Sequence, residues 1–130
     1  VKNTLGSPDL AFTSSFDGLD TETWPYLSLG LSFIHATKAQ SDVNTIAVYA
    51  PYFGKLQGTS LGIGSTHTEI KTYYDSKYKE KSQALWIFTI YYYEIKEEPV
   101  PPYTVNICLG FMYNSRDEVA MILVGYPIQK

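Results

Sequence analysis

The stretch VNTIAVYAP, residues 43–51, and the stretch VAMILVGYP, residues 119–127, decide the fold because they share one apolar frame. Each begins with valine, has isoleucine three residues later and valine two residues after that, and ends in proline. Apolar residues that alternate at this spacing are typical of a β-strand with one buried face. The frame therefore predicts a fold unit that is built twice along the chain.

The residues before each frame extend the correspondence. An alternating run of apolar residues precedes both frames: Leu27, Leu29, Leu31 and Phe33 correspond to Val105, Ile107, Leu109 and Phe111. Further upstream, Val1, Lys2, Leu5 and Ser7 correspond to Ile70, Lys71, Tyr74 and Ser76. We expect a single domain, residues 1–130, made of repeat 1 (1–54, truncated at its N-terminus) and repeat 2 (58–130).

Hydrophobic periodicity predicts mainly strands. Runs of apolar and aromatic residues predict strands at 12–16, 26–35, 43–50 and 85–95, and a hairpin of 103–113 with 118–126 around Asn114–Asp117. The polar or proline-rich segments 17–23, 78–83 and 97–102 are expected to be turns or loops.

One local motif marks a helix. Thr66 and Glu69 have the spacing of a capping box, in which each side chain bonds the other residue's backbone N–H. Apolar Ile70, Tyr73 and Tyr74 then recur at helical spacing, which predicts a helix over about 68–77. Residues 1–8 are expected to contain the end of an equivalent helix. The predicted class is α+β, with an antiparallel sheet of about six to seven strands and helices packed on one face.

The run Gly64-Ser65-Thr66, then Glu69-Ile70, a helix and a three-stranded meander resembles the outer-membrane assembly lipoprotein BamE and the tandem unit of the β-lactamase-inhibitor protein. Leu5-Gly6-Ser7-Pro8 fits those families' helix end, whereas residues 74–77 lack its glycine and proline. The resemblance implies an extracytoplasmic protein (periplasmic, cell-surface or secreted), often a lipoprotein, that binds other proteins. None of the families' binding residues lies within the shared motif.

Catalytic and metal-binding patterns are not found in the sequence. The histidines, His35 and His67, lack the close spacing of a metal site and are expected at the surface. Cys108 lacks a basic neighbour and is expected to be a small packed thiol. The carboxylate pairs at 97–98 and 117–118 fall in predicted turns, where solvated charge is the simpler interpretation. We expect no catalytic residues, no metal and no cofactor.

Composition narrows the partners. The net charge is −3 and no basic patch stands out, so nucleic-acid binding is not expected. No apolar run is long enough to cross a bilayer. The 12 tyrosines suit either a sheet or a wet protein interface.

The predicted sheet has one face of small residues bordered by large ones. The large side chains expected on or near that face are Trp86, Phe88, Tyr92, Tyr49, Met121 and Leu123. We expect this face to bind a protein partner or a second copy, so that the function is that of a binding or scaffolding module. The alternative is a small-molecule carrier or degenerate enzyme whose sheet curls around a pocket lined by Trp86, Phe88 and Tyr91–Tyr93.

Overall fold

The computed structural model describes residues 6–9, 12–16, 19–36, 45–85, 88–100 and 103–125. Their regular elements are β1 (Phe12–Phe16), β2 (Leu19–Tyr26), the 3-10 turn η1 (Leu27–Leu29), β3 (Leu31–Ala36), β4 (Thr45–Tyr49), α2 (His67–Tyr74), β5 (Lys81–Leu85), β6 (Phe88–Val100), β7 (Tyr103–Tyr113) and β8 (Val119–Gly125).

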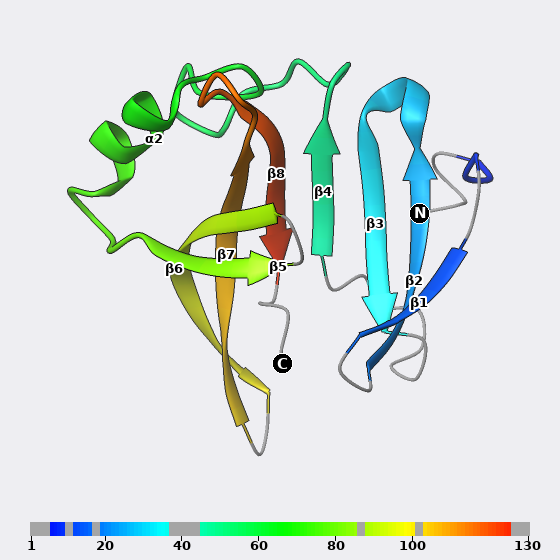
Figure 1. The fold of residues 1–130 in the computed structure, drawn as a ribbon. Coiled ribbons are helices and arrows are strands. Elements are labelled where there is room, and N and C mark those ends of the chain that lie inside the picture. The colour runs from blue at the N-terminus through cyan, green and yellow to red at the C-terminus, as the bar shows by residue number, and fades with distance from the viewer. Residues whose placement is uncertain are drawn as a thin grey trace.

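The strands form one antiparallel sheet in the order β1-β2-β3-β4-β8-β7-β6-β5 (Figure 1). Each four-stranded meander is joined to the other through its last strand, because β4 pairs with β8 at the centre of the sheet. The expected antiparallel sheet is confirmed. The described residues contribute eight strands to it, rather than about six to seven.

The capping box is confirmed. The Thr66 side chain accepts a hydrogen bond from the Glu69 backbone N–H, and the Glu69 carboxylate accepts one from the Thr66 backbone N–H at 3.0 Å. The hydrogen bonds that the Thr66 backbone N–H and the Thr66 hydroxyl donate to the Glu69 carboxylate lower the pKa of Glu69. The helix ends at Tyr74, three residues earlier than expected. Within the described ranges α2 is the only α-helix, so the expectation of several helices on one face is not supported.

The core lies between α2 and one face of β6, β7 and β8. Ile70 and Tyr74 of the helix pack against the sheet residues Tyr93, Leu109, Phe111 and Ile122, with Leu61 and Val119 closing the cluster. Residues that are paired across neighbouring strands point to the same side. By register, Trp24, Tyr26, Leu31, Phe33, Ile46 and Val48 therefore share this helix side.

Two segments that were expected to be irregular are strands. Residues 19–23 belong to β2 and residues 81–83 belong to β5, because each segment has a neighbouring strand whose backbone groups it satisfies. Conversely, the expected strand 26–35 is interrupted. Gly30 adopts a left-handed conformation after η1, and Leu27 and Leu29 are exposed at 58% and 44% rather than half-buried in a strand.

The expected strand 85–95 is confirmed from Phe88 onward, where β6 begins, but Leu85 belongs to the preceding strand, because it ends β5 and pairs with Phe88. Residues 97–100 of the expected turn at 97–102 belong instead to β6, which continues to Val100. Pro99 is tolerated there because β5 pairs only with residues 88–92 of β6, so no described strand lies along one edge of the far end of β6. The helix predicted to end within residues 1–8 and the repeat limits lie partly outside the described residues.

Candidate functional site

The large side chains predicted for the sheet face come from three strands. Tyr49 on β4 pairs in register with Met121 on β8, and Leu123 two residues further along pairs with Gly110 on β7. Gly110 in turn pairs with Tyr92 on β6. The structure therefore brings Tyr49, Tyr92, Met121 and Leu123 to the side opposite α2. We call this side the open face.

The floor of the open face consists of small residues, as expected. Ser32, Ala47, Cys108 and Gly110 are all buried. The Tyr49 hydroxyl lies 2.7 Å from Ser32 Oγ and donates to the Leu31 carbonyl at 3.1 Å. These contacts satisfy the hydroxyl and fix the orientation of the Tyr49 ring over the floor.

The first part of β6 bends over this floor. A Cβ atom placed on Gly110 would lie 3.1 Å from Ile90 Cγ2 and 3.7 Å from Leu123 Cβ. The register shifts between Glu94 and Lys96, which is where a bulge allows a strand to bend. In Figure 1, β5 accordingly runs across β7 in the view rather than alongside it. The face is thus curved, and its large side chains are only partly exposed.

Two further residues, Phe88 and Trp86, were predicted for this face. Phe88, at the start of β6, is 50% exposed and by strand alternation lies on the same side as Tyr92. Trp86 lies outside the described residues.

The charged side chains that border the open face neutralise each other. Lys81 pairs in register with Tyr92, and its Nζ donates to Glu94 Oε1 at 2.8 Å. The Asn106 side-chain amide donates to the other oxygen of Glu94 at 2.9 Å. The bond to Glu94 raises the pKa of Lys81. Cys108 is buried beside this pair, and burial raises the pKa of its thiol, so the expectation of a packed rather than a reactive cysteine fits.

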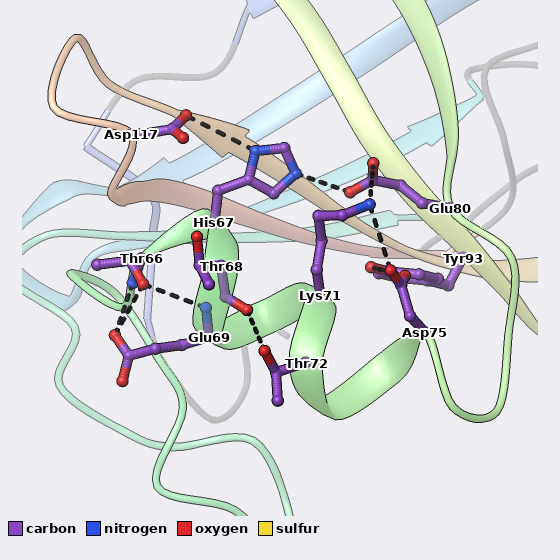
Figure 2. A network of polar contacts seen from close by, with 10 residues as sticks. All are labelled: Thr66, His67, Thr68, Glu69, Lys71, Thr72, Asp75, Glu80, Tyr93 and Asp117. Carbon is purple, nitrogen blue, oxygen red and sulfur yellow. Dashed lines mark hydrogen bonds and ion pairs between the residues drawn. The ribbon is translucent and has the colours of Figure 1, made fainter.

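His67 is not the surface residue that the sequence suggested. Its ring stacks on Tyr113 with ring centres 4.1 Å apart, and its side chain is only 17% exposed. Nε2 lies 2.8 Å from Glu80 and Nδ1 lies 3.6 Å from Asp117 (Figure 2). The His67 backbone N–H also donates to the Asp117 carbonyl at 2.8 Å. Sequence spacing could not reveal this contact, because the three residues come from three separate segments.

The network continues along α2 and into the sheet. Lys71 Nζ bridges Glu80 and Asp75 at 3.3 Å each, and these bonds raise the pKa of Lys71. Asp75 also accepts a hydrogen bond from the Tyr93 hydroxyl at 3.2 Å (Figure 2). Both His67 nitrogens face carboxylates. The network fastens α2 to the loop before β5, to β6 and to the β7–β8 turn.

The Tyr113 hydroxyl is buried and has no hydrogen-bond partner among the described residues, whereas that of Tyr93 is paired with Asp75. We expect Tyr113→Phe to leave the free energy of unfolding unchanged or to raise it, because it removes an unsatisfied polar group. Tyr93→Phe should lower it by about 1 kcal/mol, because it removes a bond and leaves Asp75 one donor short. Urea unfolding of both variants checks this; equal losses would contradict it.

The same tyrosines predict alkaline sensitivity. Burial, the largest cause, raises the pKa of Tyr74, Tyr93 and Tyr113 above the ordinary value of 10.0. Above about pH 10 the unfolded chain loses these phenolic protons while the folded protein keeps them, so stability falls as the pH rises further. Thermal melts between about pH 8 and 11 should show a falling midpoint. The fall should be smaller in Tyr113→Phe, and an identical pH profile would argue against this assignment.

The tyrosines that were expected to line the pocket of a small-molecule carrier or degenerate enzyme lie on both sides of the sheet. Tyr91 contacts His67 on the helix side and Tyr93 is wholly buried in the core, whereas Tyr92 lies on the open face. Adjacent strand residues point to opposite sides, so these three tyrosines do not line one cavity. A depression of about 570 Å³ lies elsewhere, between the end of α2 and the loop before β5, and is lined by Lys71, Asp75, Ser76, Lys77, Tyr78, Lys79 and Glu80.

Within the described part of the chain, no group of three or more histidine, cysteine, aspartate or glutamate side chains could hold a metal ion. None of the described helices is long and apolar enough to span a membrane. Comparison with family models, with curated proteins and with solved structures found no match for this chain.

Proposed function

We propose that this protein is a non-enzymatic, extracytoplasmic binding or scaffolding module that holds a protein partner on the open face of its sheet. The observation that carries the proposal is the composition of that face: Tyr49, Tyr92, Met121 and Leu123 surround a buried floor of small residues. Partly exposed aromatic and methionine side chains around a close-packed centre are the usual chemistry of a protein interface. The extracytoplasmic location rests on the sequence resemblance alone.

We also propose that the two meanders are equivalent units. Leu31 pairs with Val48 in the first meander, and Leu109 pairs with Val124 in the second. Phe33 likewise pairs with Ile46, and Phe111 pairs with Ile122. These pairings agree with the correspondence read from the two sequence frames.

The second strand of each meander continues the equivalence. Tyr26 on β2 pairs with Leu31, and Tyr93 on β6 pairs with Leu109. The ring of Tyr26 meets Phe33 edge-on at 5.8 Å and 81°. The ring of Tyr93 meets Phe111 edge-on at 6.4 Å and 75°. The same aromatic pair therefore packs in the same way on the helix side of each meander.

The hydroxyls of these tyrosines also bind corresponding places. Tyr26 donates to the Gly6 carbonyl at 2.8 Å, and Tyr93 donates to the Asp75 carboxylate. Gly6 follows Leu5, and Asp75 follows Tyr74, the residue that corresponds to Leu5 in the sequence. Each tyrosine thus ties its sheet to the segment that precedes its own first strand.

The β4–β8 pairing has the register that a two-fold axis requires. Ile46 pairs with Val124, and Val48 pairs with Ile122. Since Ile46 corresponds to Ile122 and Val48 corresponds to Val124, exchanging the two units leaves this pairing unchanged. The axis would pass between Ala47 and Leu123, which pair with each other and correspond to each other. Two units related in this way make one continuous open face. An experimental structure in which β1–β4 does not superimpose on β5–β8 would contradict the equivalence.

A capture experiment tests the function. The immobilised protein is exposed to a cell-envelope extract, and the wild type is compared with the double variant Tyr92→Ala/Leu123→Ala. The matched control is Val124→Ala, because Val124 adjoins Leu123 on β8 but points to the helix side and is 39% exposed.

We expect the wild type and the control to retain a protein that the double variant loses. Retention by all three chains would overturn the assignment to the open face. A small molecule retained without any protein would instead favour the carrier alternative.

A further inference from the structure

Exposed apolar side chains gather at one end of the sheet, outside the open face. Leu27 and Leu29 of η1 are exposed, and so are Tyr52 and Phe53, which follow β4. Phe53 is the most exposed of the four, at 89%. Half of the large apolar side chains that are exposed among the described residues thus lie in two short segments.

The two segments are held side by side. The Tyr49 backbone N–H donates to the Gly30 carbonyl at 2.9 Å, and the Tyr52 N–H donates to the Tyr49 carbonyl at 2.9 Å. A Cβ atom on Gly30, which follows Leu29, would lie 2.9 Å from Tyr52 Cβ. In Figure 1 the turn between β2 and β3 and the end of β4 accordingly lie at the same end of the sheet. We call Leu27, Leu29, Tyr52 and Phe53 the apolar tip.

Packing within the fold leaves the apolar tip in solvent. None of its four residues belongs to the core beneath α2. The Tyr52 ring lies over Gly54, where a Cβ atom would be 2.6 Å from Tyr52 Cζ, so Phe53 between them is turned outward. Burial of such side chains recovers hydrophobic free energy, and exposed apolar patches therefore mark contact sites for proteins or membranes.

The charge beside the tip matches a lipid surface. Within the described residues 24–36 and 45–66, Lys55 is the only lysine, arginine, aspartate or glutamate. Lys55 is exposed and forms no ion pair with any described residue, in a chain whose net charge is −3. A free cation next to apolar side chains is the combination that binds anionic lipid headgroups at a membrane surface.

The neighbouring carboxylates face the protein. The Asp9 carboxylate accepts a hydrogen bond from the Leu27 backbone N–H at 2.6 Å. The β7–β8 turn carries Asp117 and Glu118 on the α2 side, where Asp117 faces His67 at 3.6 Å (Figure 2). Lys55 is therefore the free charge nearest to Phe53 in the sequence.

We propose that the apolar tip inserts into the headgroup region of a lipid bilayer, with Lys55 beside the lipid phosphates. Leu27, Leu29 and Phe53 supply the apolar area on which the strength of such binding depends. Tyr52 suits the boundary, because its ring is apolar and its hydroxyl is polar. This contact is separate from the open face and gives the protein a second binding surface.

A protein partner or a second copy fits the tip less well. The exposed surface of the four side chains amounts to roughly 500 Å². A stable protein interface takes about 800 Å² from each partner. A bilayer has no such requirement, because each inserted side chain gains its own transfer free energy without a matching surface.

Vesicle sedimentation tests the proposal. The full chain is mixed with vesicles of equal parts phosphatidylcholine and phosphatidylglycerol, and with vesicles of phosphatidylcholine alone. We expect the wild type to sediment with the mixed vesicles and Phe53→Ala to lower the partition coefficient about tenfold or more. Lys55→Gln should lower it about fivefold on the mixed vesicles and leave binding to phosphatidylcholine unchanged.

Phe88→Ala is the matched control, because Phe88 is also an exposed phenylalanine but lies at the start of β6. It should bind vesicles as the wild type does, and so should the open-face variant Tyr92→Ala/Leu123→Ala. The lipid contact and the proposed function are therefore tested independently.

A fluorescent label locates the inserted residue. Bimane is attached to Phe53→Cys or, as the control, to Phe88→Cys; the native thiol of Cys108 is buried. Vesicles should shift the emission of the label at position 53 to the blue and leave that at position 88 unchanged.

Failure of the wild type to sediment with either vesicle would overturn the lipid contact. Equal losses in Phe53→Ala and Phe88→Ala, or equal emission shifts at the two positions, would overturn its assignment to the tip. Unchanged vesicle binding by Phe53→Ala, together with loss of a captured envelope protein, would make the tip a protein contact instead.

Discussion

Replacement of Gly30 by alanine should destabilise this protein by roughly 2–5 kcal/mol. Gly30 has a φ of +70°, where a Cβ atom costs about 1–2 kcal/mol. That atom would also lie 2.1 Å from the Tyr49 carbonyl oxygen and 2.6 Å from the Tyr52 nitrogen. Both obstacles are backbone atoms, so the end of β4 must move, and forced packing of this kind costs typically about 1–3 kcal/mol more.

Gly58→Ala is the matched control for this prediction. Gly58 has a nearly identical φ of +75°, but nothing lies within 4 Å of its ideal Cβ position. It should lose only about 1–2 kcal/mol, the backbone part of the cost. Midpoints of urea unfolding for the two variants separate the contributions. Equal midpoints would mean that contacts of the added Cβ atom with the end of β4 do not lower the free energy of unfolding.

Replacement of Phe111 by alanine should cost about 3–5 kcal/mol, a large part of the stability of a domain of this size. Phe111 is completely buried at the centre of the cluster between α2 and the sheet, and its ring packs near those of Tyr74, Tyr93 and Tyr113. Truncation removes the transfer free energy of the ring and leaves a cavity that rigid neighbouring strands cannot close.

Phe53→Ala provides the comparison for Phe111→Ala. The Phe53 side chain is 89% exposed, so its loss should change the free energy of unfolding by less than about 0.5 kcal/mol. Denaturant unfolding followed by circular dichroism measures both variants. A Phe111 variant as stable as the Phe53 variant would mean that α2 does not depend on this core.

The sequence predicted those strands in which apolar residues alternate with other residues along the chain. The alternating residues of β4, β7 and β8 have one apolar side, and that pattern places Met121 and Leu123 opposite Ile122 without further information. The capping box of α2 is equally local, since Thr66 and Glu69 satisfy each other's backbone.

The sequence could not predict that residues 19–23 and 81–83 are strands, nor could it predict the His67 network. Residues 19–23 and 81–83 are polar, and they become strands only because β3 and β6 offer hydrogen-bond partners that lie far away in the chain or beyond a turn. His67, Glu80 and Asp117 are separated in sequence, so their meeting depends on the packing of α2 against the β7–β8 turn. For the same reason, the pairing of Lys81 with Glu94 at the border of the open face could not be foreseen.

The amino-acid sequence by itself determined which residues alternate and where α2 begins, because periodicity and capping involve neighbours along the chain. Only the tertiary structure decided that β4 meets β8 with Ala47 against Leu123, and that β6 bends so that Ile90 lies over Gly110. Those choices depend on contacts between distant segments, whose free energy is realised only when the whole sheet has assembled.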